Sequence, residues 1–153
     1  MKQIEELFRQ YTGSKVADMY ELPSSGSNRR YFRVSGGGRT LIGAKGTSID
    51  ENKAFIEIDR HFHAKGLAVP EVLAVSDDMQ FYLQEDLGDI TLFNRISQGR
   101  ESGNYSEYEI SLLKKTISAL PKIQFEGGRG LDYSICFPQP EFDERMISFD
   151  LNY

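Results

Sequence analysis

Small polar residues gather between positions 24 and 28, where the chain has the composition of a phosphate-binding loop. In a loop between two antiparallel strands, such residues let the backbone approach a phosphate closely, and several N–H groups then face one small volume. The segment lacks the Gly-Lys-Ser/Thr ending of a P-loop and does not open a helix as a dinucleotide-binding turn does. An ordinary hairpin turn explains the same residues, which are Ser24, Ser25, Gly26, Ser27 and Asn28.

A lysine at the end of a predicted strand is the second candidate for phosphate chemistry. Residues 41–45, Leu-Ile-Gly-Ala-Lys, resemble the Val-Ala-Ile-Lys strand of protein kinases, whose lysine contacts phosphates and pairs with a glutamate of the next helix. On this resemblance Lys45 pairs with Glu57, whereas Glu51 has the position of a capping-box glutamate. Plainer interpretations stay open: Lys45 is a solvated strand-end residue, and Glu57 forms a surface pair within its own helix, with Lys53 or Arg60.

The most informative motif is Phe-Tyr-Leu-Gln-Glu-Asp-Leu-Gly-Asp at residues 81–89, in which an apolar strand runs into acids, a Leu-Gly pair and a helix start. Together with residues 22–33, 51–55 and 66–72, it resembles the aminoglycoside phosphotransferase and choline kinase superfamily, which has a protein-kinase-like fold. Within that superfamily it is most similar to bacterial N-acetylmuramate and N-acetylglucosamine-type sugar kinases and related phosphotransferases. The resemblance covers residues 20–95 with the motifs in order. It implies a hinge that binds adenine through its backbone and joins two lobes, formed by Gln84, Glu85, Asp86 and Leu87.

This resemblance also implies ATP and Mg²⁺ as cofactors and a sugar-like or aminoglycoside-like hydroxyl as the acceptor of the γ-phosphate. Because the subfamily does not always keep a lysine at the position of Lys45, Arg29 or Arg30 would share its phosphate role. The family's His-Gly-Asp-x-x-x-x-Asn catalytic loop and later metal-binding Asp are expected to lie outside this sequence. We therefore expect an N-terminal lobe at residues 1–86 and the start of a truncated second lobe at residues 87–153, inactive as a kinase alone.

One segment, residues 88–94, does match the Gly-Asp-x-x-x-x-Asn spacing of that loop. Leu87 replaces the histidine and no apolar strand follows, so Asp89 is better explained as the N-cap of a short helix. His61 and His63 stand two residues apart in a predicted helix, where their side chains point in different directions and do not predict a shared metal site. Cys136 has no histidine nearby and predicts a packed thiol.

The elements that must position these residues form an α+β protein: a five-stranded antiparallel sheet with one packed helix, then a hinge and further helices. Alternating and β-branched residues predict the strands, and the glycine triplet at 36–38 predicts a hairpin turn. Apolar residues at helical spacing, with polar caps, predict the helices. Residues 99–104 and 127–140 are expected to be irregular. The predicted strands are 16–22, 31–34, 39–45, 71–76 and 79–86, and the predicted helices begin near residues 4, 48, 89, 106 and 141.

The composition limits which partners, disulfides and cellular location we expect. A net charge of −5 over 153 residues gives no reason to expect nucleic acid or an anionic membrane as the main partner. The single cysteine forms no intramolecular disulfide, and without an apolar leader or span the protein is expected to be cytoplasmic. Two other interpretations stay open: a non-catalytic binding module that forms a homodimer through an exposed interlobe surface, and an unrelated α+β sensor domain.

Overall fold

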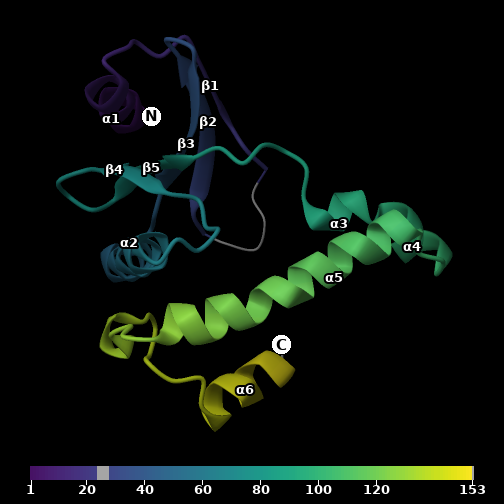
Figure 1. The fold of residues 1–153 in the computed structure, drawn as a ribbon. Helices are drawn as coiled ribbons and strands as arrows, with labels where there is room; N and C mark the ends of the chain where they lie inside the picture. The colour runs from purple at the N-terminus through teal and green to yellow at the C-terminus, as the bar shows by residue number, and fades with distance from the viewer. Residues whose placement is uncertain (24–27, 153) are drawn as a thin grey trace.

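A computed structural model describes residues 1–23 and 28–152 of the chain. Its centre is an open five-stranded antiparallel sheet with the strand order β1-β2-β3-β5-β4 (Figure 1). The predicted α+β class and the five-stranded antiparallel sheet are thereby confirmed. The strands are β1 (Asp18–Glu21), β2 (Arg30–Gly36), β3 (Arg39–Lys45), β4 (Val72–Val75) and β5 (Phe81–Glu85).

The sheet contains two hairpins. The connection between β2 and β3 is tight, whereas residues 76–80 join β4 to β5, a longer connection than the two-residue turn expected from the sequence. Gly37 and Gly38 both have positive φ, 58° and 78°, between the paired residues Gly36 and Arg39. Two consecutive positive φ angles match the right-handed twist of the flanking strands, and glycine adopts them at little cost. The predicted turn between β2 and β3 is therefore present. The predicted turn at residues 77–78 lies within the longer connection between β4 and β5.

Helix α1 (Lys2–Thr12) covers one face of the sheet. Its apolar stripe, Ile4, Leu7 and Phe8, is buried against a cluster of strand residues. Gly43 on β3 permits this close approach, because a Cβ atom there would lie 2.5 Å from Cγ2 of Ile4. The helix ends at Gly13, which has the left-handed φ of 73° that commonly terminates helices. The strand residues in the cluster are Phe32, Val34, Leu41, Phe81 and Leu83.

Helix α2 (Ile49–Ala64) packs on the other face. Ile56 is fully buried with Ala44 and Tyr82, and the ring of Phe55 stacks on that of Tyr82 with centroids 5.2 Å apart. The sheet thus carries two helices, one per face, where the sequence analysis places only one. The reason is visible in β5, where Phe81, Tyr82 and Leu83 are all buried: a strand with consecutive apolar residues requires cover on both sides.

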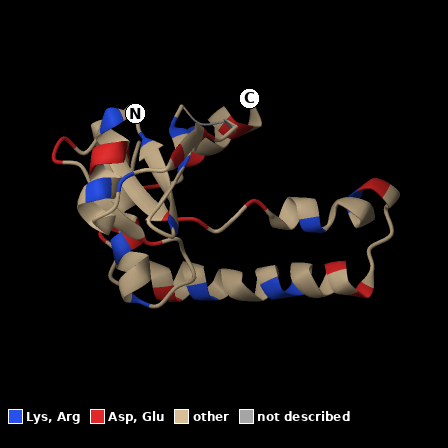
Figure 2. Cartoon of the chain, turned by 90° about the horizontal axis from the view of Figure 1, so that it is seen from above, with Lys and Arg blue, Asp and Glu red and all other residues tan. Residues whose placement is uncertain are grey.

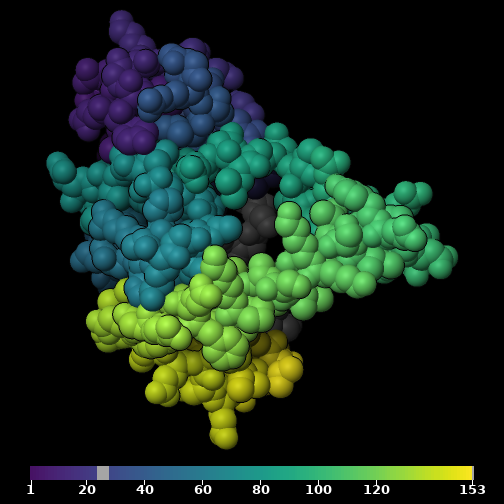
Figure 3. All heavy atoms as spheres, in the orientation of Figure 1, coloured from purple at the N-terminus to yellow at the C-terminus, as the bar shows by residue number. Residues whose placement is uncertain are grey.

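The chain beyond β5 is helical. After the linker at residues 86–91 come two short helices, and helix α5 (Glu107–Pro121) then runs below the sheet (Figure 1). The π-helix that follows α5 returns to α2, where His61 Nε2 lies 2.8 Å from the carbonyl oxygen of Gly127. Seen as spheres, this helical part packs on the α2 side of the molecule, away from α1 (Figure 3). The elements are α3 (Leu92–Arg95), α4 (Ser97–Ser102), α5 (Glu107–Pro121), the π-helix η1 (Lys122–Gly127), the 3₁₀ turn η2 (Tyr133–Ile135) and α6 (Glu144–Leu151).

Local capping explains where these helices begin. Ser106 and Glu109 form the two reciprocal hydrogen bonds of a capping box at the start of α5, where the sequence predicts a helix start but not this box. The carboxylate of Glu109 also accepts a hydrogen bond from the N–H of Gly99, at 2.8 Å. This hydrogen bond ties residues 97–102, which form a helix, to α5. The irregular segment expected at residues 99–104 is therefore helical at residues 99–102 and irregular only at residues 103–104. Acidic and basic side chains are mixed along these elements (Figure 2).

Among the helices of residues 1–23 and 28–152, none is both long enough and apolar enough to cross a bilayer.

Candidate functional site

A cavity of about 370 Å³ lies between the sheet and the linker that follows β5. Four segments that are distant in sequence meet there: the end of β1, strands β2 and β3, the residues before β4, and the linker. The predicted hinge residues Gln84, Glu85, Asp86 and Leu87 all line it. The complete lining is Leu22, Pro23, Tyr31, Arg33, Ile42, Pro70, Gln84, Glu85, Asp86, Leu87, Gly88 and Asp89.

The sheet wall of the cavity is a row of cross-strand partners. Arg33 on β2 pairs with Ile42 on β3, and Ile42 pairs with Gln84 on β5. Directly paired residues point to the same face of a sheet, and residues two apart on one strand share a face. Tyr31 therefore joins this row on the face opposite to α1. The result is an apolar centre at Ile42 with a cation at one end and a carboxamide at the other.

A guanidinium joins this wall to the linker. Arg33 donates to both carboxylate oxygens of Asp86, from Nε at 2.6 Å and from Nη2 at 2.9 Å, and its Nη1 lies 2.6 Å from Asp89 Oδ1. Nη1 also donates to the Tyr20 hydroxyl at 3.2 Å. Burial raises the pKa of Asp86, but the hydrogen bonds from Arg33 and from the N–H of Gly88 outweigh it, so its pKa lies below the ordinary value. Both groups are therefore charged at neutral pH.

Gln84 carries a buried polar atom at this cavity. Among the residues that the structure describes, its Oε1 has no hydrogen-bond partner. A buried acceptor without a donor costs about 1–3 kcal/mol, so such groups are uncommon in folded proteins. A carboxamide presents a donor and an acceptor together, and rotation of its outer torsion exchanges their positions. Gln84 can therefore match either kind of polar group on a ligand.

Lys45 and Glu57 are not brought together. Lys45 is the cross-strand partner of Phe81, whose ring packs under α1, and Lys45 Nζ lies 6.0 Å from the centre of that ring. Glu57 lies on α2, across the sheet, and its carboxylate is 2.9 Å from Arg60 Nη1 with both side chains about half exposed. The alternating faces of β3 explain this result, because Ala44, and not Lys45, points toward α2.

An ion pair that motif matching missed lies on the α2 face. Arg29 Nη2 is 3.1 Å from Glu51 Oε1, and the guanidinium stacks over the ring of Phe55 at 4.8 Å. The side chain of Arg29 is only 10% exposed. Ser48 caps α2 by accepting from the N–H of Glu51, as predicted, while the Glu51 carboxylate turns to Arg29. The sequence does indicate on which side Arg29 lies. Alternate residues of a strand share one face of the sheet, and Arg29 therefore lies on the same face as Tyr31 and Arg33.

The remaining candidates are dispersed. Ser24, Ser25, Gly26 and Ser27 lie outside the described residues, and Asn28 is exposed beside them. Asp89 does not cap α3, so that prediction is wrong: Thr91 accepts the capping hydrogen bond from Asn94, and Asp89 pairs with Arg33 instead. The two histidines contact different segments, His61 at Gly127 and His63 at Glu71. Cys136 is a half-buried free thiol.

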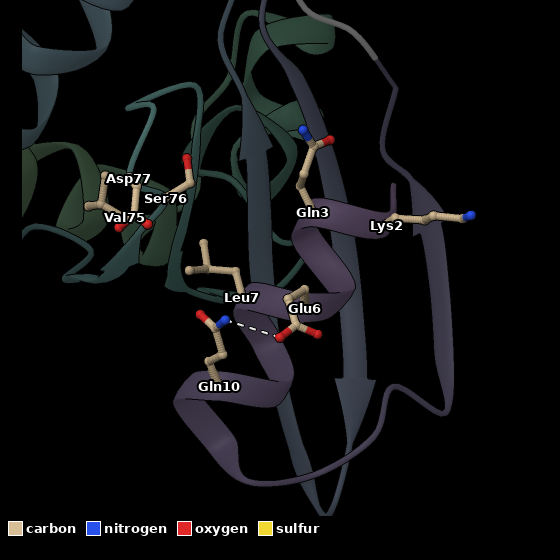
Figure 4. A pocket seen from close by; sticks show the side chains of 8 residues that line it. All are labelled: Lys2, Gln3, Glu6, Leu7, Gln10, Val75, Ser76 and Asp77. Carbon is tan, nitrogen blue, oxygen red and sulfur yellow. Dashed lines mark hydrogen bonds between the residues drawn. The ribbon is translucent and has the colours of Figure 1, made fainter.

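A second hollow, of about 270 Å³, lies between α1 and the turn that joins β4 to β5 (Figure 4). One of its polar groups has partners on α1 itself: Glu6 accepts hydrogen bonds from Gln10, at 3.0 Å, and from Arg9. None of the residues singled out from the sequence lines it. The lining residues are Lys2, Gln3, Glu6, Leu7, Gln10, Val75, Ser76 and Asp77.

Comparison with known proteins adds no assignment. A scan against protein-family models gives no match, and a search of curated proteins gives none either.

Proposed function

We propose that the cavity between the sheet and residues 84–89 binds the base of a nucleotide, ATP, and that the chain is the nucleotide-binding lobe of a kinase-like small-molecule phosphotransferase. The observation that carries this proposal is the lining of the cavity. The four residues expected from the family resemblance to contact adenine, Gln84, Glu85, Asp86 and Leu87, form one continuous wall of it.

The chemistry of the lining suits a purine. Ligand sites combine apolar surface with a few polar groups and typically enclose about 300–1,000 Å³, and this cavity of about 370 Å³ lies within that range. Leu22 and Ile42 offer apolar surface to the faces of a planar ring. The carboxamide of Gln84 and the backbone of the linker offer donors and acceptors to its polar edge.

Arg29 is the residue that we assign to the nucleotide phosphates. It immediately precedes β2, on the face that carries the cavity wall, and Glu51 holds it as a helix glutamate holds the kinase lysine. Lys45 faces α1 and has no part in this proposal. Among the described residues no group of three His, Cys, Asp or Glu side chains could hold a metal ion, and we assign no metal ligand or catalytic residue. The sugar-like acceptor rests on the family resemblance.

Thermal unfolding in the presence of ATP tests the proposal. Ligand that binds only the folded state raises the melting temperature, so we expect a saturable, concentration-dependent rise. Substitution Ile42→Phe adds bulk to the centre of the cavity wall and should reduce that rise strongly. Lys45→Met, on the other face of the same strand, is the matched control and should preserve it. The proposal fails if ATP gives no rise, and the face assignment fails if Lys45→Met removes the rise while Ile42→Phe does not.

A second candidate function, a binding or self-association module, is favoured by one observation. The helical part exposes large apolar side chains: Ile117, Phe125, Phe149 and Leu151 are each more than 60% exposed. Surfaces of this kind often mark sites of protein association. Sedimentation of the protein over a range of concentrations tests it, and a concentration-dependent dimer without nucleotide binding would favour this function over the first.

A further inference from the structure

We propose that Arg33 is the positioning residue of the cavity: it holds residues 86–89 against the sheet and so keeps the linker wall in place for the base. This inference rests on the nucleotide site proposed above. The family resemblance implies only that the backbone of this linker contacts adenine. The further inference is that a side chain of the sheet, Arg33, holds the linker in position.

All three nitrogen atoms of the Arg33 guanidinium donate hydrogen bonds in this network. Nε and Nη2 bind the two oxygens of Asp86, while Nη1 binds Asp89 and the hydroxyl of Tyr20. Two parallel hydrogen bonds from a planar guanidinium to one carboxylate fix orientation as well as distance, which a lysine does not achieve. Because Tyr20 and Arg33 lie on β1 and β2, the network connects the edge of the sheet to the linker across the cavity.

The two acids enclose the turn of the linker. Asp86 Oδ1 also accepts from the N–H of Gly88 at 2.8 Å, and Gly88 adopts a positive φ of 81°. Leu87, between them, is 72% exposed and contributes little packing to hold the segment. The contacts of Arg33 are therefore the main tether between this turn and the sheet among the described residues. Without them, we expect the turn to move away and the cavity to open.

The contact of Arg33 with Asp86 and its contact with Asp89 differ in strength. The side chains of Arg33 and Asp86 are 12% and 11% exposed, whereas that of Asp89 is 76% exposed. An ion pair at the solvent surface contributes little, and a partly buried bidentate pair contributes more. Asp86 is thus the anchor, and Asp89 is an auxiliary contact. The effects of their substitutions should rank in that order.

Arg33→Lys tests the proposal in the full chain, with Arg30→Lys as the matched control. Arg30 lies on the same strand and also makes a paired contact with a carboxylate, that of Glu21, but it does not line the cavity. Hydrogen exchange of the hydrogen-bonded N–H groups of Glu85 and Gly88 reports on the wall itself, independently of any ligand. Titration with ATP, at a temperature where each variant is folded, reports on the consequence.

We expect Arg33→Lys to speed exchange of the Gly88 N–H, which donates to Asp86, at least about tenfold and to weaken ATP binding by about tenfold, a change of roughly 1.4 kcal/mol. Arg30→Lys should change neither. If Arg33→Lys lowers only the melting temperature, with exchange and ATP affinity unchanged, Arg33 has a merely structural role and the inference is wrong. If exchange rises as expected but the wild-type protein binds no ATP, the tether stands and the nucleotide site proposed above is refuted.

Discussion

Substitution Asp86→Asn isolates the anchor of the linker with almost no change in shape. The carboxamide oxygen can still accept from the N–H of Gly88, and one hydrogen bond from Arg33 can remain, but the charge and the bidentate geometry are lost. Breaking a fully buried pair costs about 3–5 kcal/mol and a surface pair contributes about 0–1 kcal/mol. With both side chains slightly exposed, and with Asp89 still next to Arg33, we expect a loss of about 1–3 kcal/mol.

Urea unfolding at pH 7 measures this loss, and its pH dependence tests the cause. The folded state lowers the pKa of Asp86, so the carboxylate contributes stability above its unfolded pKa, near 4, and this contribution is lost as the pH falls through the folded pKa. The difference between wild type and Asp86→Asn should therefore be full at pH 7 and shrink steadily below about pH 4. Asp89→Asn, at an exposed position, is the control and should change little.

Two outcomes would refute the reasoning. If Asp86→Asn unfolds at the same urea concentration as wild type, the pair does not stabilise the fold. If the difference between the two proteins stays constant from pH 7 to pH 3, the loss has a cause other than the charge of Asp86.

Three further predictions concern the packing around the site, each measured by urea or thermal unfolding. Gly43→Ala should cost about 1–3 kcal/mol, because the new Cβ would meet Cγ2 of Ile4, and it should cost less in an Ile4→Ala background, which lacks that atom. Asn52→Ala should cost about 1–3 kcal/mol, because the buried amide bonds two carbonyls of the β4–β5 turn. Burial raises the pKa of Asp59, which accepts from Val72 N–H, so Asp59→Asn should stabilise the protein at pH 7 and lose that advantage as the pH falls.

The sequence was sufficient for elements whose ends carry local chemistry. β3 has the predicted bounds, Arg39–Lys45, because glycines fix the turn before it. Helix α5 begins after Ser106 because its capping box is complete within four residues. The helix at residues 97–102 was missed because its support is not local. It depends on the hydrogen bond between Gly99 and Glu109, ten residues away. The helix propensities of residues 97–102 contain no information about this contact.

The site was predictable in part, for a related reason. Residues 84–87, which the family resemblance predicts to form a hinge, belong to one contiguous motif, and a cavity lies beside them. The choice of Lys45 followed a sequence pattern that does not specify on which face of the sheet a residue lies. Asp89 was taken as a helix cap because its partner Arg33 is 56 residues away. Pairing of this kind is decided by strand register and by the path of the linker.

The two faces of the sheet explain why the site lies where it does. The centre of the face toward α1 is filled by an apolar cluster that includes Phe8, Phe32 and Leu83. The opposite face carries polar residues at every second position of β2 and at Gln84, and α2 leaves the part of it next to the linker open to the cavity. A polar sheet face is costly to cover with apolar side chains but suits a ligand with polar edges. A nucleotide bound as we propose would approach this face, and the functional groups to test are those of Arg33, Gln84 and Arg29.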